Sequence, residues 1–184
     1  MGKRITQVSV GFLIFYELLY NILLALNNFG VVDFYFYDFY QIYSISLIAI
    51  LLILLAGFVI SFIEERGICT FLPMCFFALY LLYRYILLSH IAAMFGIYDA
   101  EILSLITCGV YTLYLLSFIS RHIANREFLM IVAYIVAIAL YVAVRYFRPD
   151  SGNEIAEILY FCAAGVFDVA LYVLQFASVS ADTE

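Results

Sequence analysis

The feature that most constrains this chain is an apolar stretch that runs from Gln41 to Ile63 without a charged side chain. About 20 consecutive apolar residues in a helix cross the roughly 30 Å hydrocarbon core of a lipid bilayer. Inside that core, only a helix or a closed barrel satisfies the hydrogen bonding of every backbone N–H and C=O group. The stretch therefore predicts a transmembrane helix.

Five further stretches have the same apolar character, and short polar segments separate them. The predicted transmembrane helices cover residues 8–26, 42–63, 69–93, 102–120, 128–146 and 155–179. The fourth is the shortest, and a partly re-entrant fourth segment would reduce the count to five. We expect an all-α fold, a polytopic transmembrane helix bundle of about six spans, with residues 1–184 forming a single transmembrane domain.

The overall composition agrees with lipid as the solvent and excludes several classes of function. Hydrophobic residues make up 68% of the 184 residues and charged residues 12%, whereas soluble domains are about half apolar and about a quarter charged. The net charge of −6 argues against direct nucleic-acid binding, which needs clustered lysine and arginine. Lysine occurs only at Lys3, so a retinal Schiff base within the membrane is excluded.

The distribution of basic residues predicts the orientation of the chain. Cytoplasmic loops carry an excess of lysine and arginine. A cytoplasmic N-terminus places one set of basic residues on the inner side, namely Lys3, Arg4, Arg66, Arg121 and Arg126. Arg148 and Arg145 then fall on the outer side. We therefore expect both termini in the cytoplasm, in a bacterial inner membrane or a plasma membrane.

Charged side chains inside the predicted helices are candidates for function, because burying a charge in a bilayer is costly. These are Glu17, Arg84 and Asp168. Asn21 follows Glu17 by four residues and shares its helix face, and Asp168, Tyr172 and Gln175 form one polar stripe. The candidate intramembrane cluster is Glu17, Asn21, Arg84, Asp168, Tyr172 and Gln175. Two interpretations stay open: polar contacts that hold helices or subunits together, or a polar conduit or sensing site.

An aromatic segment with two acidic residues lies between the first two predicted helices. It comprises Asp33, Phe34, Tyr35, Phe36, Tyr37, Asp38, Phe39 and Tyr40. Tyrosine prefers the headgroup region, where its ring is buried and its hydroxyl stays hydrated. We expect an interfacial segment on the outer leaflet, and the alternative is a docking surface for a partner or a lipid.

Small residues four apart, which let helices approach closely, occur in the second and fifth predicted helices. Gly57 and Ser61 form one such pair, and Ala133 and Ala137 form another. These pairs fit tight packing within the bundle and oligomerisation equally well.

Sequence patterns of known catalytic sites are absent from the chain. It contains no His-Glu-x-x-His, Gly-x-Ser-x-Gly or glycine-rich phosphate loop, and no base stands beside a candidate nucleophile. His90 and His122 fall near opposite ends of the membrane, His122 in a cytoplasmic turn. We expect no catalytic, cofactor-binding or metal-binding residues and no enzyme activity, although an enzyme that works within the bilayer stays open.

The favoured function is a non-enzymatic integral membrane subunit that oligomerises or anchors a partner protein, with sensing of the membrane state as a further role. Its expected partners are the lipid bilayer and a homo-oligomer or another membrane or soluble protein. The alternative is a small channel or transporter that uses Glu17, Arg84 and Asp168. In size and hydrophobicity alone, the chain is also similar to the membrane component of Kiwa-type anti-phage systems and to accessory subunits of respiratory complexes, which gives a weaker alternative.

Overall fold

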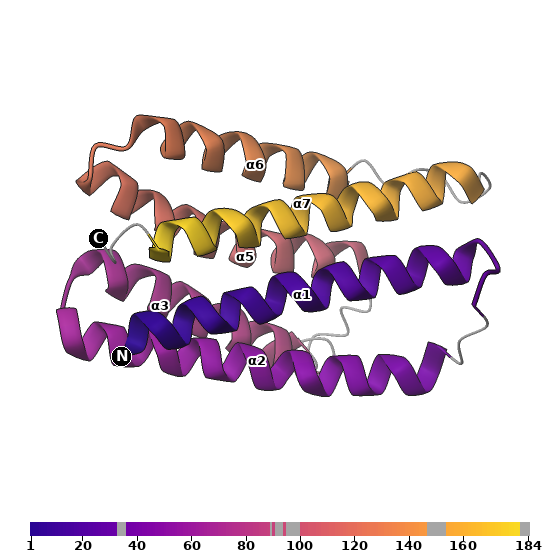
Figure 1. Cartoon of the computed structure of the whole chain (residues 1–184), viewed down its shortest axis with the longest axis horizontal. Coiled ribbons are helices and arrows are strands. Elements are labelled where there is room, and N and C mark those ends of the chain that lie inside the picture. Colours follow the sequence, from indigo (N-terminus) through magenta and orange to yellow (C-terminus); the bar gives the residue numbers. More distant parts are fainter. Residues whose placement is uncertain (33–35, 89, 91–93, 95–99, 147–153, 181–184) are drawn as a thin grey trace.

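Long apolar helices form almost all of the chain that the structure describes (Figure 1). The computed structural model describes residues 1–32, 36–88, 90, 94, 100–146 and 154–180, and for residues 28, 36–40, 100, 101 and 154 it describes the backbone alone. The helices are α1 (Gly2–Asn28), α2 (Phe36–Glu65), α3 (Ile68–Leu82), the π-helical continuation η1 (Tyr83–Leu87), α5 (Ala100–Ala124), α6 (Phe128–Tyr146) and α7 (Glu154–Ser180). With α3 and η1 taken together, the described chain contains six helices that are long and apolar enough to cross a membrane, so the predicted six-span bundle is confirmed.

The helix ends differ from the sequence prediction in several places. The alternative of a short, partly re-entrant fourth span was wrong. Helix α5 is a regular helix of 25 residues that continues past Ser120 through Arg121 and His122. Helix α1 begins at Gly2 rather than at residue 8, and α2 begins at Phe36 rather than at residue 42. The predicted end of the third span at residue 93 lies outside the described residues.

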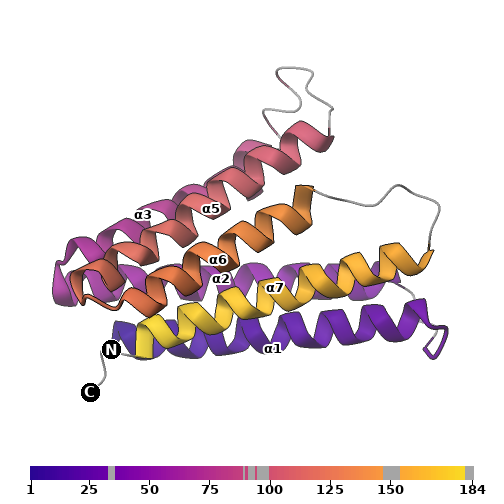
Figure 2. The ribbon, with the colours of Figure 1, turned by 90° about the horizontal axis from the view of Figure 1, so that it is seen from above.

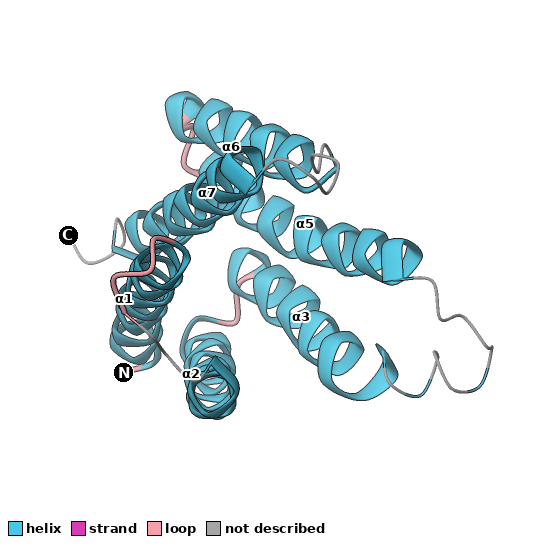
Figure 3. Cartoon of the chain, turned by 90° about the vertical axis from the view of Figure 1, so that its right-hand side faces the viewer, coloured by secondary structure: helices cyan, strands magenta, loops and turns pink. Residues whose placement is uncertain are grey.

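The six spans form a ring in which each helix packs against its neighbours in sequence, and α7 returns to pack against α1. Figure 3 shows this ring from one end, with α1, α2, α3, α5, α6 and α7 around it. The short turns between α2 and α3 and between α5 and α6 make these consecutive helices antiparallel neighbours.

Two short turns lie at the same end of the bundle as the N-terminus and the C-terminal end of α7 (Figure 1). Arg66 occupies the turn between α2 and α3, and Arg126 occupies the turn between α5 and α6. Both arginines have positive φ, 48° and 59°, in the left-handed region that glycine usually adopts after a helix. Toward the opposite end, α3 and α5 diverge from α1 and α2, as Figure 2 shows.

The outer surface of the bundle is apolar, as a lipid environment requires. Large hydrophobic side chains that are more than half exposed include Phe12, Phe15, Leu52, Ile53, Leu129 and Val166. Such a continuous apolar surface would be unusual on a soluble monomer. Together with the six apolar helices, it identifies an integral multi-pass membrane protein.

Glycine lets α1 and α2 approach closely near the end that carries the termini. A Cβ atom added to Gly57 would lie 2.7 Å from Oγ1 and 3.0 Å from the backbone nitrogen of Thr6. One turn further along α2, Ser61 packs directly against Gly2. The small pair Gly57 and Ser61 therefore packs within the bundle, against α1.

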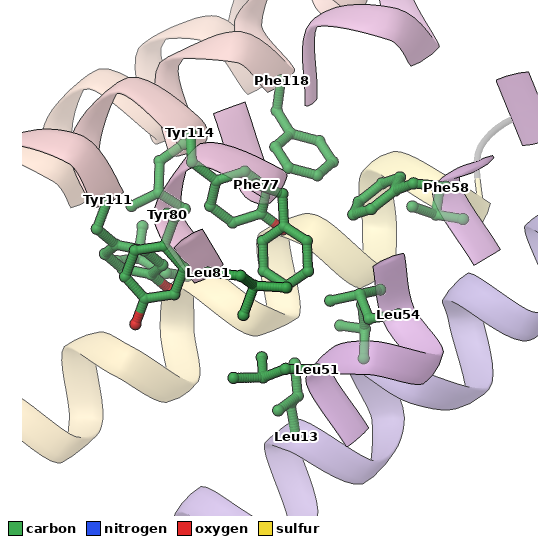
Figure 4. Close-up of a cluster of buried hydrophobic side chains, with 14 of the residues drawn as sticks. Leu13, Leu51, Leu54, Phe58, Phe77, Tyr80, Leu81, Tyr111, Tyr114 and Phe118 are labelled. Atoms are coloured by element: carbon green, nitrogen blue, oxygen red, sulfur yellow. The ribbon is translucent and has the colours of Figure 1, made fainter. Parts of the chain in front are cut away.

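An aromatic cluster fills the middle of the bundle (Figure 4). We call its central part, Phe58, Phe77, Tyr114 and Phe118, the aromatic layer. Phe58 lies with its ring centroid 5.8 Å from Phe77, 6.5 Å from Tyr114 and 6.2 Å from Phe118. Edge-on and tilted contacts at these distances are favourable for aromatic pairs. The aromatic layer thus joins the three consecutive helices α2, α3 and α5.

Candidate functional site

A polar cavity of about 550 Å³ lies among the helices of the ring, and we call it the vestibule. All six spans contribute to its lining. The lining residues are Glu17, Tyr20, Tyr43, Ser44, Leu47, Tyr80, Arg84, Tyr85, Leu88, Ser104, Thr107, Cys108, Tyr111, Tyr141, Arg145, Asp168 and Tyr172. Four of these side chains are charged and seven are tyrosines, so the vestibule is unlike the apolar interior expected of a bundle that packs only by shape.

The vestibule brings together most of the residues that the sequence singled out. Glu17, Arg84, Asp168 and Tyr172 all line it, although they come from α1, η1 and α7. Asn21 lies beside it and contacts Glu17. Gln175 lines a smaller adjoining cavity instead. The polar stripe predicted on α7 therefore faces the interior of the ring.

Arg145 and Asp168 form an ion pair at the wall of the vestibule. Nη2 of Arg145 donates a hydrogen bond to Oδ2 of Asp168 over 2.8 Å, which joins α6 to α7. The guanidinium group of Arg145 also lies 5.3 Å from the centroid of the Tyr141 ring, within the range of a cation–π contact. The pair neutralises two of the four charges in the vestibule.

Glu17 is held by two hydrogen-bond donors. The Tyr43 hydroxyl donates to Oε2 over 3.3 Å, and Nδ2 of Asn21 lies 3.4 Å from Oε1. The same Asn21 nitrogen donates to the Glu17 carbonyl over 2.7 Å, and the Asn21 side chain packs directly against Gly165 of α7. No arginine, lysine or histidine in the described part of the chain forms a salt bridge with Glu17.

Arg84 reaches the vestibule from the π-helical turn η1. Its Nη1 donates a hydrogen bond to the Tyr80 hydroxyl, and its guanidinium carbon lies 5.8 Å and 5.7 Å from the ring centroids of Tyr80 and Tyr85. Single π-helical turns inside α-helices are frequent at functional sites. No acidic side chain among the described residues forms a salt bridge with Arg84.

A smaller cavity of about 20 Å³ adjoins the vestibule, and the two share Leu47, Tyr80, Arg84, Tyr111 and Tyr172 as lining residues. A space of this size holds one water molecule. Gln175 lines it, is fully buried, and accepts a hydrogen bond of 3.1 Å from the Tyr114 hydroxyl on Oε1. Polar side chains therefore continue from the vestibule toward the centre of the bundle, beside leucines and Phe77 that line the same cavity.

A third cavity, also of about 20 Å³, lies beyond the aromatic layer, toward the chain termini. Thr6, Ser61, Thr70 and Arg121 are among its lining residues. Along α2, the lining residues pass in order from Leu47 and Leu54 on the vestibule side, through Phe58, to Ser61. The three cavities thus lie along one line through the ring, and the aromatic layer separates the last from the other two.

A buried histidine cluster lies near the end of the bundle that carries the termini. Nδ1 of His122 lies 2.6 Å from Oε2 of Glu127, and Nε2 lies 2.7 Å from Oγ of Ser178. Tyr134 contacts the same Ser178 oxygen at 3.0 Å, and Ser178 donates to the Leu174 carbonyl. The expectation that no base stands beside a nucleophile was wrong, because His122 contacts the Ser178 hydroxyl. The placement of His122 in a turn was also wrong, because α5 continues to Ala124 and carries His122 into the core.

The His122 cluster contains a serine, a histidine and a carboxylate in the order found in hydrolases. Ser178 is only 1% exposed and does not line the vestibule, so a substrate has no access to its hydroxyl in this state. The contacts instead connect α5, α6 and α7. Among the described residues, no group of three histidine, cysteine, aspartate or glutamate side chains is arranged to hold a metal ion.

Sequence reasoning missed two features of this site. Arg145 was counted only among the basic residues of the outer side and was not included in the candidate cluster, whereas its side chain lines the vestibule. The tyrosine lining was also missed, since 17 tyrosines occur throughout the chain without a period that marks one cavity.

Of the aromatic segment, Phe36 to Tyr40 form the first residues of α2, and Asp33 to Tyr35 lie outside the described residues. Its role at the outer leaflet stays a prediction. No protein-family model, curated protein or solved structure matches this chain.

Proposed function

We propose that this protein is a membrane transport protein that gives a small polar solute a gated path through the ring of helices. This is the first alternative that the sequence suggested, the channel or small transporter that uses Glu17, Arg84 and Asp168. The observation that carries the proposal is the vestibule of about 550 Å³, which places these three charges in one cavity lined by all six spans. Pockets of this volume accommodate small-molecule ligands.

The line of cavities through the ring supports a path rather than a closed binding pocket. Polar lining continues from the vestibule to Gln175 and begins again beyond the aromatic layer at Ser61, Thr6 and Arg121. Polar groups buried in a bilayer are costly unless they line a path or pair with one another. Their presence on both sides of the aromatic layer fits a path that is closed at its middle.

The aromatic layer acts as the gate in this proposal. Phe58 and Tyr114 each contact the other three rings, and Phe77, Tyr114 and Phe118 are almost fully buried. A hydrophobic constriction excludes water and polar solutes without any charge. Movement of Phe58 or Phe118 away from the axis would connect the vestibule with the cavity beside Arg121.

The proposed orientation places both termini in the cytoplasm, so the vestibule opens to the outside. It follows from the basic residues of the turns at the end of the bundle that carries the termini, which include Arg66 and Arg126. A bacterial inner membrane or a plasma membrane remains our proposal for the location. The anchoring or oligomerising subunit, the Kiwa-type component and the respiratory accessory subunit stay predictions from the sequence.

The experiment that tests the proposal opens the aromatic layer in the purified, reconstituted protein. Phe58→Leu and Phe118→Leu together remove two rings but keep the core apolar. We expect liposomes that contain this double variant to take up glycerol and urea several-fold faster than liposomes with the wild type, measured by stopped-flow light scattering after an osmotic step.

A matched control carries Phe12→Leu and Phe15→Leu, which remove two rings from the lipid-facing surface, where both side chains are more than half exposed. Circular dichroism and size-exclusion chromatography establish that both double variants are folded. Equal solute permeability in the two folded variants would contradict a path through the aromatic layer.

A further inference from the structure

The charges of the vestibule divide into one neutralised pair and two charges without a salt-bridge partner. Arg145 and Asp168 neutralise each other over 2.8 Å. Glu17 and Arg84 line the same vestibule from α1 and η1, and neither forms a salt bridge with another described residue. Within the described lining, the vestibule therefore presents one carboxylate and one guanidinium group to its contents.

Both charges are positioned by their neighbours rather than left to move freely. Tyr43 and Asn21 contact the two carboxylate oxygens of Glu17. Tyr80 and Tyr85 hold the guanidinium group of Arg84 between a hydrogen bond and two ring faces. Groups held in this way lose little conformational entropy when they bind a ligand.

Glu17 and Arg84 form no salt bridge with each other, although Arg145 and, less strongly, Arg84 attract the Glu17 carboxylate across the vestibule. Glu17 belongs to α1 and Arg84 to η1, and α2 stands between these helices in the ring. A ligand that bridges the vestibule would bring a positive group to Glu17 and a negative group to Arg84. Each buried charge would then gain the partner that the described chain does not supply.

We propose that the vestibule binds a small zwitterion that carries an ammonium group and a carboxylate group. The ammonium group binds Glu17 beside the Tyr43 hydroxyl, next to the stacked rings of Tyr20 and Tyr43, whose centroids are 4.5 Å apart. The carboxylate binds Arg84, because a guanidinium group matches two carboxylate oxygens with parallel N–H donors. This inference rests on the proposed function and names its solute class.

The same pair of charges discriminates against other solutes. A simple amine is attracted by Glu17 but repelled by Arg84, and a simple carboxylate is affected in the opposite way. A neutral solute leaves both charges without partners. Specificity of this kind comes from the unfavourable partner as much as from the favourable one.

The test measures equilibrium binding to the purified full-length protein in lipid nanodiscs, by isothermal titration calorimetry. The probes are glycine, γ-aminobutyrate and glycine betaine as zwitterions, n-butylamine as the amine, butyrate as the carboxylate and butyramide as the neutral compound. We expect at least one zwitterion to bind at least tenfold more tightly than n-butylamine, butyrate or butyramide.

Two charge-neutralising variants test the assignment of each end of the ligand. Glu17→Gln is expected to weaken zwitterion binding at least tenfold and to abolish the preference for the zwitterion over butyrate. Arg84→Gln is expected to weaken it by a similar factor and to abolish the preference over n-butylamine. Glu64→Gln and Arg66→Gln change the same charges at the opposite end of the bundle, outside the three cavities, and should leave binding unchanged.

The outcomes separate this inference from the proposed function. Zwitterion binding that depends on Glu17 and Arg84, without solute flux in the Phe58→Leu, Phe118→Leu double variant, supports the inference and contradicts transport. Flux of glycerol without zwitterion binding supports a path and overturns the inference. Absence of binding by every probe, or zwitterion binding that neither variant changes, also overturns the inference.

Discussion

The guanidinium group of Arg145 donates a 2.8 Å hydrogen bond to the Asp168 carboxylate and so joins the last turn of α6 to the middle of α7 at the vestibule wall. The Arg145 side chain is 39% exposed and the Asp168 side chain 15%, so one partner faces the cavity and the other is largely enclosed. The pair satisfies both charges within the chain, in contrast to Glu17 and Arg84, and we therefore assign it a structural role.

Asp168→Ala should destabilise the protein modestly, because it leaves Arg145 without its carboxylate partner. Solvent in the vestibule screens the exposed guanidinium group, so we expect a loss of about 1 kcal/mol rather than the several kcal/mol of a fully enclosed pair. The free energy of unfolding in mixed micelles titrated with dodecyl sulfate measures this loss. A double-mutant cycle with Arg145→Gln isolates the pair, and a coupling energy of zero would contradict the structural role.

Gly57→Ala should destabilise the contact between α1 and α2. The added Cβ would lie 3.0 Å from the backbone nitrogen of Thr6, which cannot move without displacing α1. We expect a loss of about 1–3 kcal/mol, typical of overpacking. Gly109→Ala in α5 is the matched control, since nothing lies within 4 Å of its Cβ position; there alanine should stabilise the helix by about 0.5–1 kcal/mol. Effects of the same sign on thermal unfolding would argue against the predicted contact.

Ser178→Ala should destabilise the protein more than Tyr134→Phe does. The serine oxygen is shared by His122, Tyr134 and the Leu174 carbonyl, so its removal leaves a nitrogen of the buried His122 ring without a partner. An unsatisfied buried polar group costs about 1–3 kcal/mol, whereas Tyr134→Phe removes one hydrogen bond worth about 1 kcal/mol. Chemical unfolding curves of the two variants decide the order, and a larger effect of Tyr134→Phe would show that the tyrosine, not the serine, is the centre of the cluster.

Gly165→Ala should weaken zwitterion binding although Gly165 does not line the vestibule. Its new Cβ would meet the Asn21 side chain, which contacts Glu17. The expected effect on affinity is the same in kind as that of Asn21→Ala. Because both changes act through one side chain, the double variant should bind no more weakly than Asn21→Ala alone. Additive losses in calorimetric titrations would place the effect of Gly165 elsewhere in the protein.

The number of spans and most of the candidate cluster could be predicted from the sequence, because both follow from the cost of burying polar groups in lipid. The stretch from Gln41 to Ile63 has no alternative to a membrane helix, and Glu17, Arg84 and Asp168 would be too costly if they faced lipid. That cost predicts that the three residues face the interior of the bundle together. It does not predict the volume of the cavity or its other lining residues.

The contacts of His122 and Arg145 could not be predicted in the same way. His122 and Ser178 are 56 residues apart, and their contact depends on the rotation of α5 relative to α7, which no local pattern encodes. Arg145 lies at the end of a span beside Arg148, where a loop position and an inward-facing position have the same sequence signature. The packing of whole helices against one another determines the contacts of both His122 and Arg145.

The π-helical turn Tyr83–Leu87 affects how this protein can change during evolution. A π-turn contains one residue more than an α-helix would use over the same length. Loss of one codon between residues 83 and 87 would restore a regular α-helix and preserve all six spans. The helix on either side of the deletion would keep its orientation, because the residue is removed from the turn that accommodated it. A single deletion can therefore exchange the residue that stands at the position of Arg84 while the bundle around it stays the same.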